Sequence, residues 1–204
     1  MTIECIETGD FCTDTYLIIE GKSAIVVDPG DDYERIMSRL DALGANAEYV
    51  LVTHAHFDHI GAVASFSANG AKVYIAEVDY NILIQNDFYV DLGFFGNKVE
   101  RFDADRLLRD GDSFEICNHH FSVIATPGHT PGGVCFCLDE KYIFSGDTLF
   151  YLSVGRTDFP LCSHSDLIQS IKKLFALKGD YTVYPGHGKS TTLDFERKNN
   201  PDVS

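Results

Sequence analysis

The chain alternates between two patterns of apolar and polar residues, one with the spacing of strands and one with that of helices. Short apolar or alternating runs predict strands at 15–20, 24–28, 48–53, 72–76, 106–109, 113–117, 121–126, 134–138, 142–144 and 181–184. Apolar residues spaced three and four apart predict helices at 33–43, 59–68, 77–85 and 165–177. Residues 86–105 follow neither pattern clearly.

Strands dominate two regions of the chain, and helices follow each of them. This order predicts an α/β fold in which two sheets pack face to face with helices outside, with a single mixed sheet as the alternative. The chain has 204 residues, a length typical of one domain, so we expect a single domain over residues 1–204.

Composition narrows the classes of function. The formal net charge is −15, whereas a nucleic-acid surface needs clustered Lys and Arg, so we expect no nucleic-acid partner. The apolar runs are far shorter than a membrane span, and Met1-Thr2-Ile3-Glu4-Cys5 lacks the features of a signal peptide, so we expect a cytoplasmic protein without membrane partners. None of the six cysteines forms a Cys-x-x-Cys pair, and we expect buried, reduced thiols.

A cluster of histidines follows the strand predicted at 48–53. Residues 53–59 read Thr-His-Ala-His-Phe-Asp-His, which places three imidazoles and a carboxylate within six positions. In an extended segment His54 and His56 point the same way, while Asp58 and His59 lie where the chain turns into a helix. Imidazole and carboxylate are the ligands that zinc takes in hydrolytic sites, so this segment predicts a metal site.

Three later segments share a second pattern, in which a glycine and then a His or Asp follow an apolar strand. They are Gly128-His129, Gly146-Asp147 and Gly186-His187. Each places one candidate ligand at the end of a strand, where a glycine lets the backbone approach closely. Together with the first cluster they provide five His and two Asp. Seven ligands are too many for one tetrahedral ion and indicate two.

These motifs resemble those of the metallo-β-lactamase superfamily, and the similarity runs from Asp28-Pro29-Gly30 to the C-terminus. The resemblance implies a four-layer αββα sandwich with the metals at one edge. It also implies two ligand sets and a bridging residue: His54, His56 and His129 for the first ion, Asp58, His59 and His187 for the second, and Asp147 between them. Asp28 is implied as a residue that orients the histidine loop by hydrogen bonds.

Within the superfamily, the chain is similar to short glyoxalase II-like hydrolases. The similarity lies in residues 148–160 and in the tail Glu196-Arg197-Lys198-Asn199-Asn200-Pro201, while Asp147 argues against true β-lactamases. We expect the protein to lack the C-terminal helical domain of glyoxalase II, and Gly188-Lys189 stands where that family has a Tyr beside the last metal His. Arg156 resembles the position of a substrate-binding Lys, and the alternative is that it orders its loop by pairing with Asp158.

The implied chemistry is hydrolysis by a hydroxide shared between two divalent ions, zinc being expected and iron or manganese the alternatives. Asp58 and Asp147 are the carboxylates assigned to catalysis. A thiolate leaves with little help from an acid, so the expected substrate is a small anionic thioester resembling S-acyl-glutathione. The alternative function is a mononuclear iron oxygenase resembling the persulfide dioxygenases. A third alternative is a metal-stabilised binding protein without activity. We expect His119, His120 and His164 to lie on the surface.

Overall fold

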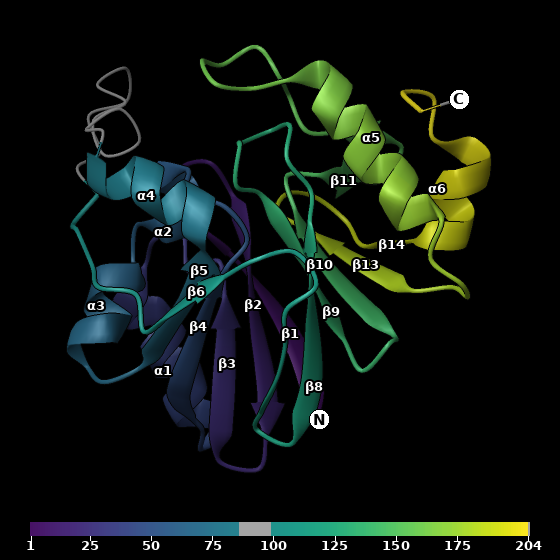
Figure 1. Cartoon of the computed structure of the whole chain (residues 1–204). Coiled ribbons are helices and arrows are strands. Elements are labelled where there is room, and N and C mark those ends of the chain that lie inside the picture. Colours follow the sequence, from purple (N-terminus) through teal and green to yellow (C-terminus); the bar gives the residue numbers. More distant parts are fainter. Residues whose placement is uncertain (86–98, 204) are drawn as a thin grey trace. The chain divides into compact units, whose positions relative to one another are not determined.

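The computed structural model describes residues 1–85 and 99–203 and divides the chain into two compact units, Met1–Leu108 and Arg109–Ser204 (Figure 1). The segment 86–98, which includes most of the sequence without a clear pattern, lies outside the described residues. None of the helices in the described part of the chain is long and apolar enough to cross a bilayer.

Unit 1 contains a six-stranded sheet with the strand order β1-β2-β3-β4-β5-β6. The first three strands pair antiparallel, and β3 to β6 pair parallel. Because parallel strands need crossover connections, helices separate β3 from β4 and β4 from β5. The strands are β1 (Thr2–Thr8), β2 (Thr13–Glu20), β3 (Ser23–Val27), β4 (Asn46–Val52), β5 (Lys72–Ala76) and β6 (Arg106–Leu108).

Helices cover the unit 1 sheet and complete its core. They are α1 (Tyr33–Leu43), α2 (Phe57–Ile60), α3 (Val63–Ala68) and α4 (Glu77–Gln85). The core joins alternate strand residues to Ile36 and Leu40 of α1 and to Val63 and Phe66 of α3. The opposite face of the central strands is also buried toward their carboxyl ends, which explains the continuous apolar runs at 24–27 and 50–52.

Unit 2 contains a second six-stranded sheet, with the order β14-β13-β10-β9-β8-β7, and a small β11–β12 hairpin. Strands β10 and β13 are parallel, and the other pairs of this sheet are antiparallel. The strands are β7 (Ser113–Ile116), β8 (His119–Ala125), β9 (Val134–Leu138), β10 (Tyr142–Gly146), β11 (Leu149–Phe150), β12 (Ser153–Val154), β13 (Thr182–Pro185) and β14 (Thr191–Thr192).

The helices of unit 2 are α5 (His164–Phe175) and α6 (Leu193–Asn199), which lie side by side (Figure 1). Helix α5 begins at the N-cap Ser163, whose side chain accepts a hydrogen bond from Asp166 N, and it buries Leu167, Ile171 and Leu174. Arg197 of α6 ties the two helices together, since its guanidinium donates to carbonyl oxygens of the chain that follows α5.

The main helices and strands predicted from the pattern are present, and the structure differs from the prediction in the following elements. The helix expected at 59–68 is two short helices, because the amide of Ala62 donates to the carbonyl of Pro29 (3.0 Å) instead of continuing the helix. The pattern did not predict β1, α6 or the two-residue strands β11, β12 and β14. The expectation of buried cysteines holds for Cys135 and Cys137 and is wrong for Cys5 and Cys12, which are exposed.

Candidate metal centre

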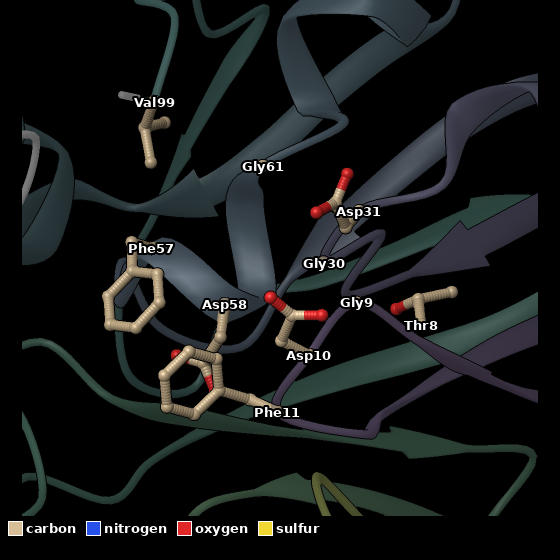
Figure 2. A pocket seen from close by; sticks show the side chains of 10 residues that line it. All are labelled: Thr8, Gly9, Asp10, Phe11, Gly30, Asp31, Phe57, Asp58, Gly61 and Val99. Atoms are coloured by element: carbon tan, nitrogen blue, oxygen red, sulfur yellow. The ribbon is translucent and has the colours of Figure 1, made fainter. Parts of the chain in front are cut away.

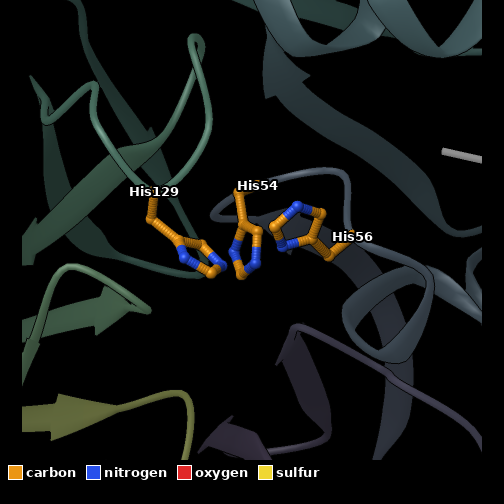
Figure 3. A group of neighbouring side chains, drawn as sticks. All are labelled: His54, His56 and His129. Atoms are coloured by element: carbon orange, nitrogen blue, oxygen red, sulfur yellow. The ribbon is translucent and has the colours of Figure 1, made fainter. Parts of the chain in front are cut away.

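Four of the predicted metal ligands lie in unit 1, in the loop after β4 and in α2: His54, His56, Asp58 and His59. The rings of His54 and His56 meet edge to face with centroids 4.8 Å apart (Figure 3), and the rings of His54 and His59 lie 4.1 Å apart. All three imidazoles are buried. The spacing of the motif therefore brings its imidazoles together below the surface.

Asp28 organises this loop. It follows β3 in the left-handed region of backbone conformation (φ 49°) and is buried. Its Oδ1 accepts a hydrogen bond from Thr53 N (2.7 Å), and its Oδ2 accepts from Thr53 Oγ1 (2.6 Å) and contacts His59 Nδ1 (3.0 Å). One carboxylate thus fixes both the start of the histidine loop and the ring of His59.

These hydrogen bonds determine which ring nitrogen faces a metal. An ionised carboxylate only accepts, so His59 Nδ1 carries the proton that it donates to Asp28. The hydroxyl of Thr53 already donates its one proton to Asp28, so it accepts from His54 Nδ1, 3.1 Å away. In both neutral rings the lone pair then lies on Nε2. Second partners of this kind are typical of metal-binding histidines.

Asp58 is held by contacts from three segments of unit 1. Thr13 Oγ1 donates to its Oδ2 (3.3 Å), and His59 Nε2 lies 3.7 Å from the same oxygen. A Cβ atom at Gly30 would stand 1.9 Å from the carbonyl oxygen of Asp58. Only glycine lets the loop after β3 approach α2 this closely, which explains the glycine of the Asp-Pro-Gly motif.

Asp79 also positions the histidine loop, and the sequence pattern did not indicate this role. It lies in the first turn of α4, its exposed fraction is 0%, and its Oδ2 accepts a hydrogen bond from Ala55 N (3.0 Å), between two candidate ligands. An acidic residue in the first turn of a helix is usual, so the pattern did not distinguish it.

A pocket of about 210 Å³ adjoins Asp58 within unit 1 (Figure 2). Phe11 and Phe57 form one part of its lining, their rings meeting edge to face with centroids 5.0 Å apart. The remaining lining residues are small, acidic or aliphatic: Thr8, Gly9, Asp10, Gly30, Asp31, Asp58, Gly61 and Val99.

The other three predicted ligands, His129, Asp147 and His187, lie in unit 2 at the ends of β8, β10 and β13. Asp147 Oδ2 lies 3.3 Å from His129 Nε2 and 3.7 Å from His187 Nε2. Since β10 and β13 are parallel neighbours, their carboxyl ends meet at one edge of the sheet. One carboxylate oxygen therefore faces two imidazole nitrogens.

His129 is oriented by the backbone of Arg156. Its Nδ1 lies 2.8 Å from the carbonyl oxygen of Arg156, and because a carbonyl only accepts, Nδ1 carries the proton and Nε2 the lone pair of the neutral ring. Next to it, a Cβ atom at Gly155 would stand 1.8 Å from the carbonyl oxygen of Asp147. The segment 155–156 thus lies directly against both ligands.

The side chain of Arg156 pairs with Asp158. Nε and Nη2 donate to the two carboxylate oxygens at 2.7 Å each, and the guanidinium lies 4.1 Å from the ring centroid of Phe159. Both charged side chains are exposed. The guanidinium lowers the pKa of the Asp158 carboxyl to about 2. The loop-ordering contact considered in the sequence analysis is present.

The remaining histidines lie in unit 2, and two of them, His120 and His164, are exposed as expected. His119 differs, because its Nδ1 contacts Asp139 Oδ2 at 2.7 Å and its side chain is only 13% exposed. It therefore pairs the first residue of β8 with the turn between β9 and β10.

The donor set of the two units consists of imidazole nitrogen and carboxylate oxygen without thiolate. Zinc, iron and manganese accept such ligands, whereas thiolate-rich sites select copper(I) and iron–sulfur clusters. His54, His59 and His129 present Nε2 with the opposite nitrogen fixed by the protein, and a neutral ring held in this way suits metal binding. The residues present thus fit a divalent transition metal.

Comparison with known proteins identifies the class. The sequence model of the metallo-beta-lactamase superfamily matches residues 8–187. The chain is 34% identical over 206 aligned positions to the hydroxyacylglutathione hydrolase GloC of Haemophilus influenzae, covering 98% of this chain and 97% of that protein. A solved structure described as the BLEG-1 B3 metallo-beta-lactamase superposes with a TM-score of 0.90, at 34% identity and 100% coverage of both chains. TTHA1623, described in a di-iron-bound form, gives a TM-score of 0.85 at 34% identity, covering 97% of this chain and 98% of the other.

The chain therefore belongs to the metallo-β-lactamase superfamily, a family of metal-dependent hydrolases. The predicted resemblance and the predicted fold class are confirmed. The matched region includes most of both units, and the prediction of one domain over residues 1–204 stays a prediction.

Proposed function

We propose that the chain is a dinuclear metal hydrolase that cleaves small thioesters. In this proposal His54, His56 and His129 would hold one ion, Asp58, His59 and His187 would hold the other, and Asp147 would be shared by both. The observation that carries it is the position of Asp147 Oδ2, within 3.3 Å of His129 Nε2 and 3.7 Å of His187 Nε2. The di-iron form of a relative at 34% identity supports two ions.

Two divalent ions supply hydroxide at neutral pH and polarise a carbonyl group when they are bound. The protein provides the fixed frame for that chemistry. Asp28 and the carbonyl of Arg156 set the tautomers and orientation of His59 and His129. Asp58, held by Thr13, and Asp147 bring negative charge to the cations. Because these contacts exist before substrate arrives, little reorganisation is needed during the reaction.

The thioester assignment rests on the leaving group and on one relative. A thiol has a pKa of about 8.5, so the thiolate leaves without a positioned acid, whereas an amine requires a proton donor. The GloC relative is described as a hydroxyacylglutathione hydrolase and matches nearly the full chain. Hydrolysis of a 2-hydroxyacyl thioester is therefore the activity to test first.

The first prediction concerns metal content and activity together. We expect purified, metal-replete protein to contain two transition-metal ions per chain, because seven ligands exceed the coordination of one tetrahedral ion. Elemental analysis measures the ions, and release of free thiol measures thioester hydrolysis. Two further assays distinguish the alternatives. If the protein holds one iron and consumes oxygen, it is an oxygenase and the proposal is wrong. If it cleaves a β-lactam faster than a thioester, an activity that the description of BLEG-1 suggests, thioesters are not its substrates.

The second prediction concerns Arg156, whose role in substrate binding stays a prediction. An acyl carboxylate would have to exchange with Asp158 for the guanidinium. If this exchange occurs, Arg156→Ala lowers kcat/KM about fivefold more for a succinyl thioester than for a butyryl thioester of the same thiol. A fivefold difference is at the upper end of the free energy of an exposed ion pair. Equal losses for both substrates would confine Arg156 to ordering its loop.

A further inference from the structure

A cation stands two residues after the candidate ligand His187, on an aromatic surface. Lys189 Nζ lies 3.5 Å from the ring centroid of Tyr151, and Tyr151 stacks on Phe195 with centroids 5.3 Å apart and planes 11° from parallel. We name Tyr151, Lys189 and Phe195 the Lys189 shelf. Its members come from the β11–β12 turn, the loop before β14, and α6.

Buried hydrogen bonds anchor the shelf. Glu196, next to Phe195, is 1% exposed, and it accepts from Leu152 N (3.0 Å) and from Thr191 Oγ1 (2.6 Å). Asn200 Nδ2 donates to Ser153 O (3.1 Å) and to Glu196 Oε2 (2.8 Å). These bonds attach the two residues that directly follow Tyr151 to α6 and to the residue after it. The Glu and Asn of the C-terminal motif thus fix the aromatic rings beneath the Lys189 cation.

The shelf adjoins the candidate centre through Phe150 and His187. Their rings meet edge to face with centroids 6.3 Å apart, and Tyr151 follows Phe150 directly. Two residues of chain span at most about 7 Å, so the backbone of Lys189 stays near that of His187. Gly188 between them has φ +80°, a left-handed turn that glycine adopts without strain. The His187 side chain is 30% exposed, so this side of the ligand set reaches solvent.

Charge explains what such a cation could bind. The chain carries a net charge of −15, so an anionic substrate meets net repulsion as it approaches the protein. Within the described part of the chain no ion pair involves Lys189, whereas the guanidinium of Arg156 already holds Asp158. The aromatic face places the ammonium without neutralising it, and an ammonium so placed retains donors for a carboxylate.

We propose that the Lys189 shelf binds a carboxylate on the thiol carrier of the substrate. The inference rests on the proposed thioesterase function and assigns the charged part of the substrate that this function left open. The acyl carbon would lie at the metal ligands, and the carrier would extend past His187 over the aromatic rings. The shelf thus selects carriers with an acidic group a short chain away from the sulfur.

The test compares two thioesters with the same 2-hydroxyacyl group, one on 3-mercaptopropionate and one on 2-mercaptoethanol, which has no charge. Lys189→Gln is expected to lower kcat/KM about fivefold more for the anionic carrier than for the neutral one, mainly by raising KM. Tyr151→Leu should act in the same direction, and Tyr151→Phe, which keeps the ring, should restore the preference. Lys172→Gln removes an exposed lysine from α5 and controls for the change in net charge.

The outcomes distinguish failure of the carboxylate site from failure of the thioesterase function. If Lys189→Gln affects both thioesters as Lys172→Gln does, while the unmodified protein hydrolyses them, the shelf is not the carboxylate site and the thioesterase function stands. If the metal-loaded unmodified protein hydrolyses neither thioester, both proposals fall. Thermal unfolding of each variant distinguishes lost binding from lost folding. The shelf is supported if Tyr151→Leu loses the preference for the anionic carrier and Tyr151→Phe retains it.

Discussion

Asp147→Ala is expected to lower kcat/KM at least about 100-fold, about 2.7 kcal/mol in activation free energy, and to reduce bound metal from two ions to at most one per chain. The reason is that one oxygen of Asp147 faces the Nε2 atoms of both His129 and His187. Removing it leaves both imidazoles without their shared carboxylate. Thioester kinetics and elemental analysis on the same preparation measure the two effects.

Two further variants make this prediction specific. His187→Ala should mainly empty one of the two metal sites, since His187 belongs to one ligand set. Asp166→Ala removes an exposed carboxylate from the first turn of α5 and serves as the control for lost charge in unit 2. Activity of Asp147→Ala within tenfold of the unmodified chain, with two ions retained, would contradict the bridging assignment.

Asp28→Asn is expected to weaken metal affinity 10- to 100-fold, the range for residues that orient metal ligands. Asparagine tolerates the left-handed backbone of this position, so the substitution tests the side chain and not the turn. Its amide has one acceptor oxygen in place of two, and its NH2 group would face a donor of Thr53 or His59. Competition with a chromophoric chelator measures the dissociation constants.

Asp28→Asn should also lower the free energy of unfolding of the metal-free protein by about 1–3 kcal/mol, since a buried donor loses its acceptor. Asp41→Asn, at an exposed position of α1, is the matched control in unit 1. Unchanged metal affinity with lowered stability would restrict Asp28 to holding the fold.

The sequence predicted helices and strands best where the residues of the element itself determine its bounds. Helix α1 repeats its apolar residues at helical spacing and ends at Gly44 with φ 67°, as predicted. The short helices α2 and α3 were predicted as one because their separation depends on Pro29, which is distant in sequence. Strand β1 escaped prediction because it is a half-exposed strand at one edge of the sheet, which pairs with β2 through its backbone.

The residues of the candidate site also differ in how well the local sequence indicates them. The candidate ligands follow strands and stand in short motifs, so composition and spacing indicate them. Asp79 and Glu196 act on backbone amides 24 and 44 residues away, and no local pattern records such contacts. The contact of the Arg156 carbonyl with His129 is even harder to predict, since a backbone acceptor does not depend on which residue carries it.

That carbonyl has a consequence for how this protein can diverge. Position 156 orients His129 through an atom that every amino acid possesses, while its side chain extends to the surface. Any residue that keeps the local backbone conformation preserves the imidazole. Mutations at this position can therefore reverse or remove the charge that an incoming molecule meets while metal loading is maintained. Substitutions at position 156 can thus change the surface charge of this loop without changing the hydrogen bond that orients His129.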